Sequence, residues 1–76
     1  MDIKQFVKVR KIKGLSQPQF ARKVGYSHGY IAALEAGHRP FTKRLQRKFL
    51  DALGIDEEEA EVLANLYDEI RGDDKE

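Results

Sequence analysis

The sequence predicts an all-α fold, one compact domain built from five short helices. Most of the segments between its six glycines repeat apolar residues every three to four positions, as one face of a helix does. No segment alternates convincingly between apolar and polar residues, as a half-buried strand would. At 76 residues the chain has room for a single small core.

Composition excludes several classes of protein. The chain has no cysteine, which excludes disulfide scaffolds and cysteine-based zinc sites and favours a reducing compartment. We expect no secretory signal, because the N-terminus lacks an apolar stretch. We also expect no membrane span, because no apolar run approaches the roughly 20 residues that a bilayer requires.

The formal net charge of +1 conceals two oppositely charged parts. Residues 1–55 carry 12 basic and 3 acidic side chains, a net charge of +9. Residues 56–76 carry 2 basic and 10 acidic side chains, a net charge of −8. Such asymmetry indicates a surface that binds a polyanion and a separate surface with another role.

The first helix is expected over residues 3–13. Steps of 100° per residue place Arg10 near the centre of its apolar stripe, where a charge must be paired or reach water. Glu35 is the only acid between Asp2 and Asp51, so we expect it to be the partner of Arg10. The apolar members of the stripe are Ile3, Phe6 and Val7.

The second and third helices follow with a tight turn between them. Ser16 and Gln19 predict a capping box at the start of the second helix, and Gly25 allows the left-handed conformation that ends it. Ser27 is the expected N-cap of the third helix, which ends at Gly37. The residues expected to face inward are Phe20, Ala21, Val24, Ile31, Leu34 and, in part, Tyr30.

The fourth helix is expected to begin after Thr42 and to end at Gly54. Its core stripe is predicted to contain Leu45, Phe49, Ala52 and Leu53. Its other side is basic and presents Lys43, Arg44, Arg47 and Lys48.

The last helix is expected over residues 56–70, capped by Asp56 and followed by a frayed acidic tail over residues 72–76. Its apolar residues cover an arc of about 200°, twice the width that an ordinary surface helix needs. These residues are Ala60, Val62, Leu63, Ala64, Leu66, Tyr67 and Ile70.

Two short helices joined by a glycine turn in a small basic domain form a helix-turn-helix arrangement. Residues 17–36 resemble the helix-turn-helix of the phage-repressor/Cro-like (Xre-type) transcriptional regulators. The matching positions are Ala21 at the helix contact, Gly25 in the turn, and Ile31 and Leu34 in the core. The flanks Gly14-Leu15-Ser16-Gln17, Leu34-Glu35-Ala36-Gly37 and Ala52-Leu53-Gly54-Ile55 also resemble the family.

The resemblance covers about residues 3–70 and implies a lambda-repressor-like DNA-binding domain over residues 1–71. It implies double-stranded DNA as partner, with the third helix in the major groove. The candidate base contacts are Ser27, His28, Gly29, Ala32 and Ala33. The candidate phosphate contacts are Gln17, Arg39, Lys43 and Arg44, to which we add Tyr30 and Arg47. Some relatives have an ion pair at the positions of Arg10 and Glu35, in agreement with the pairing expected from the helical wheel.

Some of these positions have a structural alternative. The alternative for Tyr30 is packing at the core edge, and the alternative for the basic side of the fourth helix is a solvated face. The recognition helix also departs from the family, since Gly29, Ala32 and Ala33 stand where long polar side chains usually read bases. We expect direct readout to be concentrated at Ser27, His28 and Tyr30, with DNA shape and backbone contacts supplying the rest.

The outer part of the last helix is expected to meet a second copy of the chain, because a helix-turn-helix monomer grips one half-site only. The candidate interface residues are Val62, Leu66 and Ile70. The alternative is that the wide apolar arc closes the core of a monomer. In the dimer, the acidic residues would point away from the duplex. The alternative for these residues is a long-range repulsion that reduces indiscriminate DNA binding.

The predicted function is a sequence-specific double-stranded DNA-binding transcriptional regulator, repressor-like or controller-type, acting as a dimer in a bacterial or phage-type cytoplasm. The alternative is an antitoxin-like or other protein-interaction module, with a second protein at the acidic last helix. We expect no enzymatic activity, cofactor or metal, because the sequence has no nucleophile motif, phosphate-binding glycine loop or spaced metal ligands.

Overall fold

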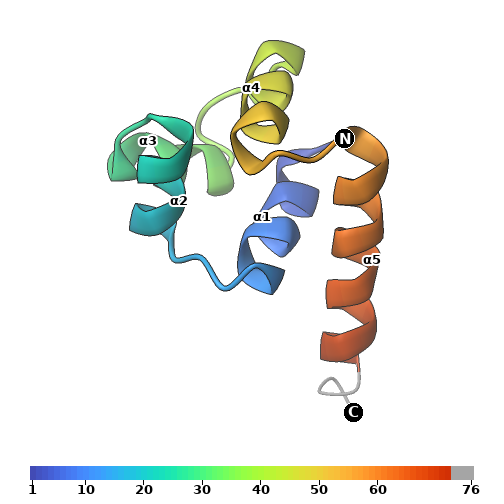
Figure 1. Ribbon diagram of the computed structural model, residues 1–76. Helices are drawn as coiled ribbons and strands as arrows, with labels where there is room; N and C mark the ends of the chain where they lie inside the picture. The colour runs from blue at the N-terminus through green and yellow to red at the C-terminus, as the bar shows by residue number, and fades with distance from the viewer. Residues whose placement is uncertain (73–76) are drawn as a thin grey trace.

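The computed structural model describes residues 1–72 as five helices without a strand, which confirms the all-α five-helix fold (Figure 1). The helices are α1 (Ile3–Ile12), α2 (Gln17–Val24), α3 (His28–Glu35), α4 (Lys43–Leu53) and α5 (Glu57–Gly72). In Figure 1, α1 lies between the α2–α3 pair and the long α5. Gly72 is the last residue of α5, and the rest of the predicted acidic tail lies outside the described residues.

Side-chain caps begin the helices at the predicted residues. Ser16 Oγ accepts a hydrogen bond from the Gln19 N–H at 3.2 Å, and the Gln19 side chain accepts from the Ser16 N–H in return. Asp2 and Gln5 form a similar capping box that was not predicted, although the same signal is present in the sequence. The other N-caps, all of them predicted, are Ser27, Thr42 and Asp56.

The core is organised around the fully buried ring of Phe49 on α4. The rings of Phe6, Phe20, Tyr26 and Phe41 surround it, with centroids 5.2–6.1 Å away. Aromatic pairs at such distances add to the free energy gained by burial alone. This cluster joins α1, α2 and α4 and holds the turn between α2 and α3 against the core.

One detail of the predicted core is wrong. Val7 on α1 is half-buried, whereas Val9, which the helical wheel left out, is fully buried. Ile3 on α1 and Ala52 on α4 are half-buried and pack against the core, as predicted. α1 contacts both α3 and α5, so its buried surface is wider than a single stripe.

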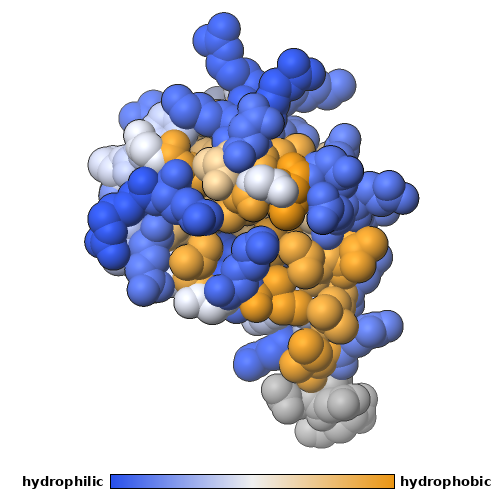
Figure 2. Space-filling view, viewed as in Figure 1, coloured by the Kyte–Doolittle hydropathy of each residue, from blue (hydrophilic) through white to orange (hydrophobic). Residues whose placement is uncertain are grey.

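α5 divides its wide apolar arc between two environments. Ala60 and Ala64 are buried, and the Lys8 Nζ on α1 lies 2.9 Å from the Asp68 carboxylate. The stripe on the other side is exposed and consists of Val62, Leu66 and Ile70, at 61%, 42% and 56% exposure. Figure 2 shows hydrophobic surface extending along this helix. No helix within residues 1–72 combines the length and the apolar character needed to cross a membrane.

Candidate nucleic-acid interface

The outer face of α3 carries small side chains and few functional groups. Ser27, His28 and Gly29 are exposed, whereas Ala32 and Ala33 are half-buried. No neighbouring atom lies within 4 Å of the position that a Cβ would take at Gly29, so this part of the helix is open. The Ser27 hydroxyl accepts a hydrogen bond from the Tyr30 N–H and thereby caps the helix. The imidazole of His28 is therefore the most prominent polar group on this face.

Arg10 and Glu35 form a bidentate ion pair between α1 and α3. Arg10 Nε donates to Glu35 Oε2 at 2.7 Å, and Nη2 donates to Oε1 at 3.0 Å. Arg10 Nη1 donates to the Leu15 carbonyl at 2.8 Å. Their side chains are only 9% and 11% exposed, so the two charges satisfy each other away from bulk water. The pair ties the end of α3 to the first helix.

Gln17 extends this ion pair to the start of α3. Its Nε2 donates to Glu35 Oε1 at 2.9 Å, and its Oε1 lies 3.2 Å from His28 Nε2. Since a carboxylate only accepts hydrogen bonds, the amide nitrogen must face Glu35 and the amide oxygen must face His28. His28 Nε2 is therefore the donor. We call the connected set of Arg10, Glu35, Gln17 and His28 the polar chain.

The polar chain changes the interpretation of Gln17. We expected this residue to bind a phosphate, but its side-chain amide is engaged within the protein. Its backbone N–H, among the first of α2, has no partner within the helix, and this N–H and the second hydrogen of Nε2 are the donors left for an anion. Sequence reasoning missed the contact with His28 because the two residues are 11 positions apart and only the turn brings them together.

The basic candidates lie beside α3 and along α4. All four of Arg39, Lys43, Arg44 and Arg47 are exposed. The last three line a shallow hollow of about 260 Å³. Tyr30 is half-buried and packs against the core, and Arg39 Cζ lies 5.9 Å from the centre of its ring. Figure 2 shows hydrophilic side chains projecting around the end of the molecule that contains α2, α3 and α4.

A model of the helix-turn-helix domain family matches residues 8–63, most of the chain. The chain belongs to the helix-turn-helix domain family. The match includes all of α2 and α3 and confirms the family assignment made from residues 17–36. No curated protein and no solved structure matches the chain.

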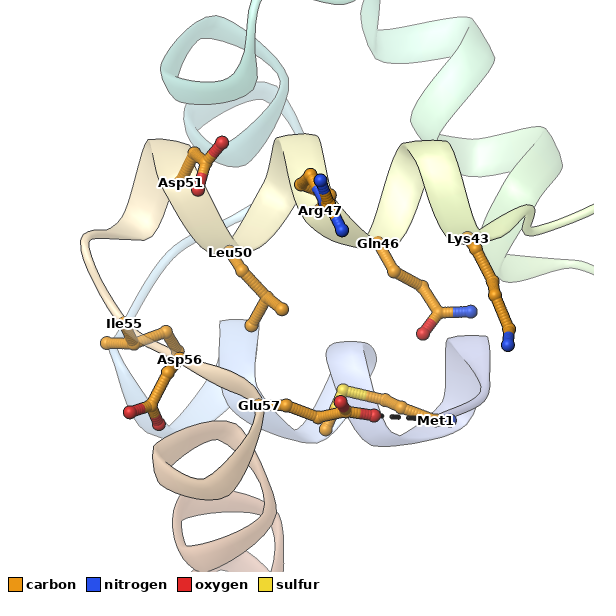
Figure 3. Close-up of a pocket in the computed structure, with 9 residues that line it drawn as sticks. All are labelled: Met1, Lys43, Gln46, Arg47, Leu50, Asp51, Ile55, Asp56 and Glu57. Carbon is orange, nitrogen blue, oxygen red and sulfur yellow. Dashed lines mark ion pairs between the residues drawn. The ribbon is translucent and has the colours of Figure 1, made fainter.

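A second hollow, of about 730 Å³, lies between α4 and the start of α5 of this helix-turn-helix domain (Figure 3). Its wall on α4 includes Lys43 and Arg47, but Asp51, Asp56 and Glu57 also line it. The carboxylates would repel a phosphate, and no residue of α2 or α3 contributes to the lining. This hollow therefore suits an anion less well than the face around α3, although it shares Lys43 and Arg47 with the basic hollow on α4.

The described part of the helix-turn-helix domain contains no cluster of three His, Cys, Asp or Glu side chains placed to hold a metal ion. Its buried side-chain nitrogen and oxygen atoms all have hydrogen-bond partners.

Proposed function

We propose that this helix-turn-helix domain is a sequence-specific, double-stranded DNA-binding transcriptional regulator, repressor-like or controller-type. Residues 1–71 act as one domain in a bacterial or phage-type cytoplasm, with residues 17–36 as the reading unit. The observation that carries the proposal is the outer face of α3, which has only small side chains at its centre and exposed cations after it and along α4. Residues 1–55, which contain this face, have a net charge of +9. Residues 56–76, which contain α5, have a net charge of −8.

The shape of α3 suits the major groove of duplex DNA. A helix with its side chains is about 10–12 Å across, and the major groove is about 12 Å wide. Gly29, Ala32 and Ala33 let the helix backbone approach the base edges closely, and Ala32 and Ala33 offer methyl groups to thymine. The exposed cations after α3 and along α4 would neutralise phosphates and release counterions, so binding should weaken steeply as salt rises.

The charge on α4 provides the test of DNA binding. The wild-type protein should bind random duplex DNA, and Lys43→Ala with Arg44→Ala should lower the salt slope of log K by about 1.8, because about 0.9 is lost per phosphate contact. Affinity at moderate salt should fall by at least about tenfold. Retardation of labelled duplex at several salt concentrations measures both quantities.

The control is Lys4→Ala with Lys11→Ala, which removes the same charge from exposed positions on α1. Its loss should be clearly smaller, because long-range charge is screened over about 10 Å at 0.1 M salt. Equal losses in the two double variants would mean that α4 makes no specific phosphate contact. If the wild-type protein does not bind duplex DNA even at low salt, the proposal of DNA binding is wrong.

His28 is the residue proposed to read sequence. His28→Ala should lower the preference for a selected operator over random duplex by about 5- to 150-fold, since one specific base contact is worth about 1–3 kcal/mol. Affinity for random duplex should change little. Selection of bound sites from random DNA, followed by titration with both variants, measures the ratio. Equal losses on both kinds of DNA would make His28 a phosphate contact.

We further propose that the domain binds its operator as a homodimer through α5. The exposed residues Val62, Leu66 and Ile70 follow one another at intervals of four, so they form one stripe on the helix. A second copy is the occupant that suits a helix-turn-helix protein, since two copies grip two half-sites about one turn of DNA apart. The selected operator should then have two-fold symmetry.

The alternative function is an antitoxin-like module that binds another protein. The observation that favours it is the same exposed stripe on α5, which has the acidic neighbours Glu58, Glu59, Glu61 and Glu69. A tight protein partner together with indifference to DNA would support this alternative. Binding of both DNA and a partner protein would agree with both functions, because antitoxins commonly repress their own promoters.

A further inference from the structure

Four side chains on one flank of α3 form a stack of two aromatic rings between two cations, which we call the aromatic–cation ladder. It contains Arg39, Tyr30, Tyr26 and Lys48 in spatial order. The rings of Tyr26 and Tyr30 lie 5.0 Å apart with an interplanar angle of 35°. Arg39 Cζ lies 5.9 Å from the centre of the Tyr30 ring, and Lys48 Nζ lies 4.9 Å from the centre of the Tyr26 ring. Each end of the ladder is thus a cation held near an aromatic ring.

The ladder is anchored to the core and yet accessible. Tyr26 lies against the fully buried Phe49, with ring centroids 6.1 Å apart, so the phenol cannot move freely. Both tyrosines are half-buried, and both cations are exposed. Within residues 1–72, neither Arg39 nor Lys48 forms an ion pair with a carboxylate. Their N–H groups that do not face a ring remain available for an anion.

The ladder lies on the opposite side of α3 from the polar chain. Tyr30 and His28 are two positions apart, which at 3.6 residues per turn separates them by about 160° around the helix. Tyr26 lies in the turn that leads into α3, directly before Ser27. Because Lys48 Nζ lies over the Tyr26 ring, it is held close to the N-terminal end of α3.

A helix that fills the major groove has one DNA strand along each flank. The flank with Gln17 and the start of α2 faces one strand, so the flank with the ladder faces the other. We propose that Tyr26 and Lys48 contact the phosphates of this other strand, through the phenol hydroxyl and the ammonium group. The proposal rests on the DNA binding proposed above and extends the contact surface to a turn residue and to the second turn of α4.

Two substitutions separate the charge from the hydroxyl. Lys48→Met keeps most of the side-chain length, and it should reduce the salt slope of log K for random duplex by about 0.9 and the affinity by about fivefold. Tyr26→Phe keeps the ring and its packing, and it should weaken binding about threefold without changing the slope, because a neutral hydroxyl releases no counterion. Lys48→Arg should restore the wild-type slope.

The matched control is Lys4→Met, which removes one exposed charge from α1. It should leave the slope within error of wild type. Thermal unfolding of each variant checks that the fold is intact. Phosphate ethylation should interfere with wild-type binding on both strands. In Lys48→Met, the interference should weaken only on the strand opposite the one that faces the start of α2.

The outcomes distinguish this proposal from DNA binding itself. Steep, salt-dependent binding by wild type together with an unchanged slope in Lys48→Met would overturn the ladder contact and leave the proposed function standing. Equal losses in Lys4→Met and Lys48→Met would overturn it as well, because net charge alone would then explain them. Full affinity in Tyr26→Phe would overturn the contact of the hydroxyl. A wild-type protein without salt-dependent binding would overturn both proposals.

Discussion

Replacing Arg10 with methionine is expected to lower the free energy of unfolding by about 3–5 kcal/mol, a large part of the stability of a small domain. The substitution leaves the carboxylate of Glu35, which is only 11% exposed, without its bidentate partner. It also removes the donor to the Leu15 carbonyl. Gln17 alone would then bond to a charge that water barely reaches. Chemical denaturation, monitored by circular dichroism, measures the loss.

The matched control is the double substitution of Arg10→Met with Glu35→Leu. Removing both charges eliminates the stranded carboxylate, and buried ion pairs can often be replaced by apolar residues at little cost. The double variant should therefore be clearly more stable than Arg10→Met alone. A melting temperature unchanged in the single variant would show that the pair contributes little to folding.

Replacing Leu66 with glutamate is expected to abolish the proposed dimer. Leu66 is the middle residue of the exposed stripe on α5, and a two-fold contact centred there would bring two new carboxylates together in an apolar interface. Affinity for an operator with two half-sites should then fall by about 10²–10⁴-fold, which is the usual gain from linking two binding modules. Sedimentation equilibrium and operator titration measure the two effects.

Asn65→Glu is the control for this substitution. It adds the same charge at the preceding, also exposed, position of α5, but outside the apolar stripe. Its sedimentation mass should remain that of wild type. If Leu66→Glu also leaves the mass unaltered, the dimer contact lies elsewhere or does not exist. A monomeric wild type would make the stripe a surface for another protein, as in the alternative function.

Local signals were sufficient for the helices and their ends. Ser16, Ser27, Thr42 and Asp56 begin helices because their side chains accept hydrogen bonds from N–H groups three residues later in the chain. Gly25 and Gly54 end helices with φ of +83° and +68°, which other residues rarely adopt. Such interactions are complete within one turn of helix, so neighbouring residues predict them.

Contacts between distant residues were predicted only in part. Arg10 could be paired with Glu35 because a buried charge requires a partner and few acids were available. No comparable scarcity pointed to the contact between Gln17 and His28, since exposed polar residues have many possible partners, including water. The stacking of Tyr26 and Tyr30 with Lys48 and Arg39 was missed for the same reason.

The residue order therefore determined that this chain forms five helices, with a helix-turn-helix at residues 17–36 and opposite charges in its two parts, because periodicity, capping and charge are properties of short segments. Packing decided the rest. It occupied the Gln17 amide with Glu35 and His28, stacked two cations on the tyrosines beside α3, and left one stripe of α5 exposed. These features depend on distances between helices, which no single segment of the sequence contains.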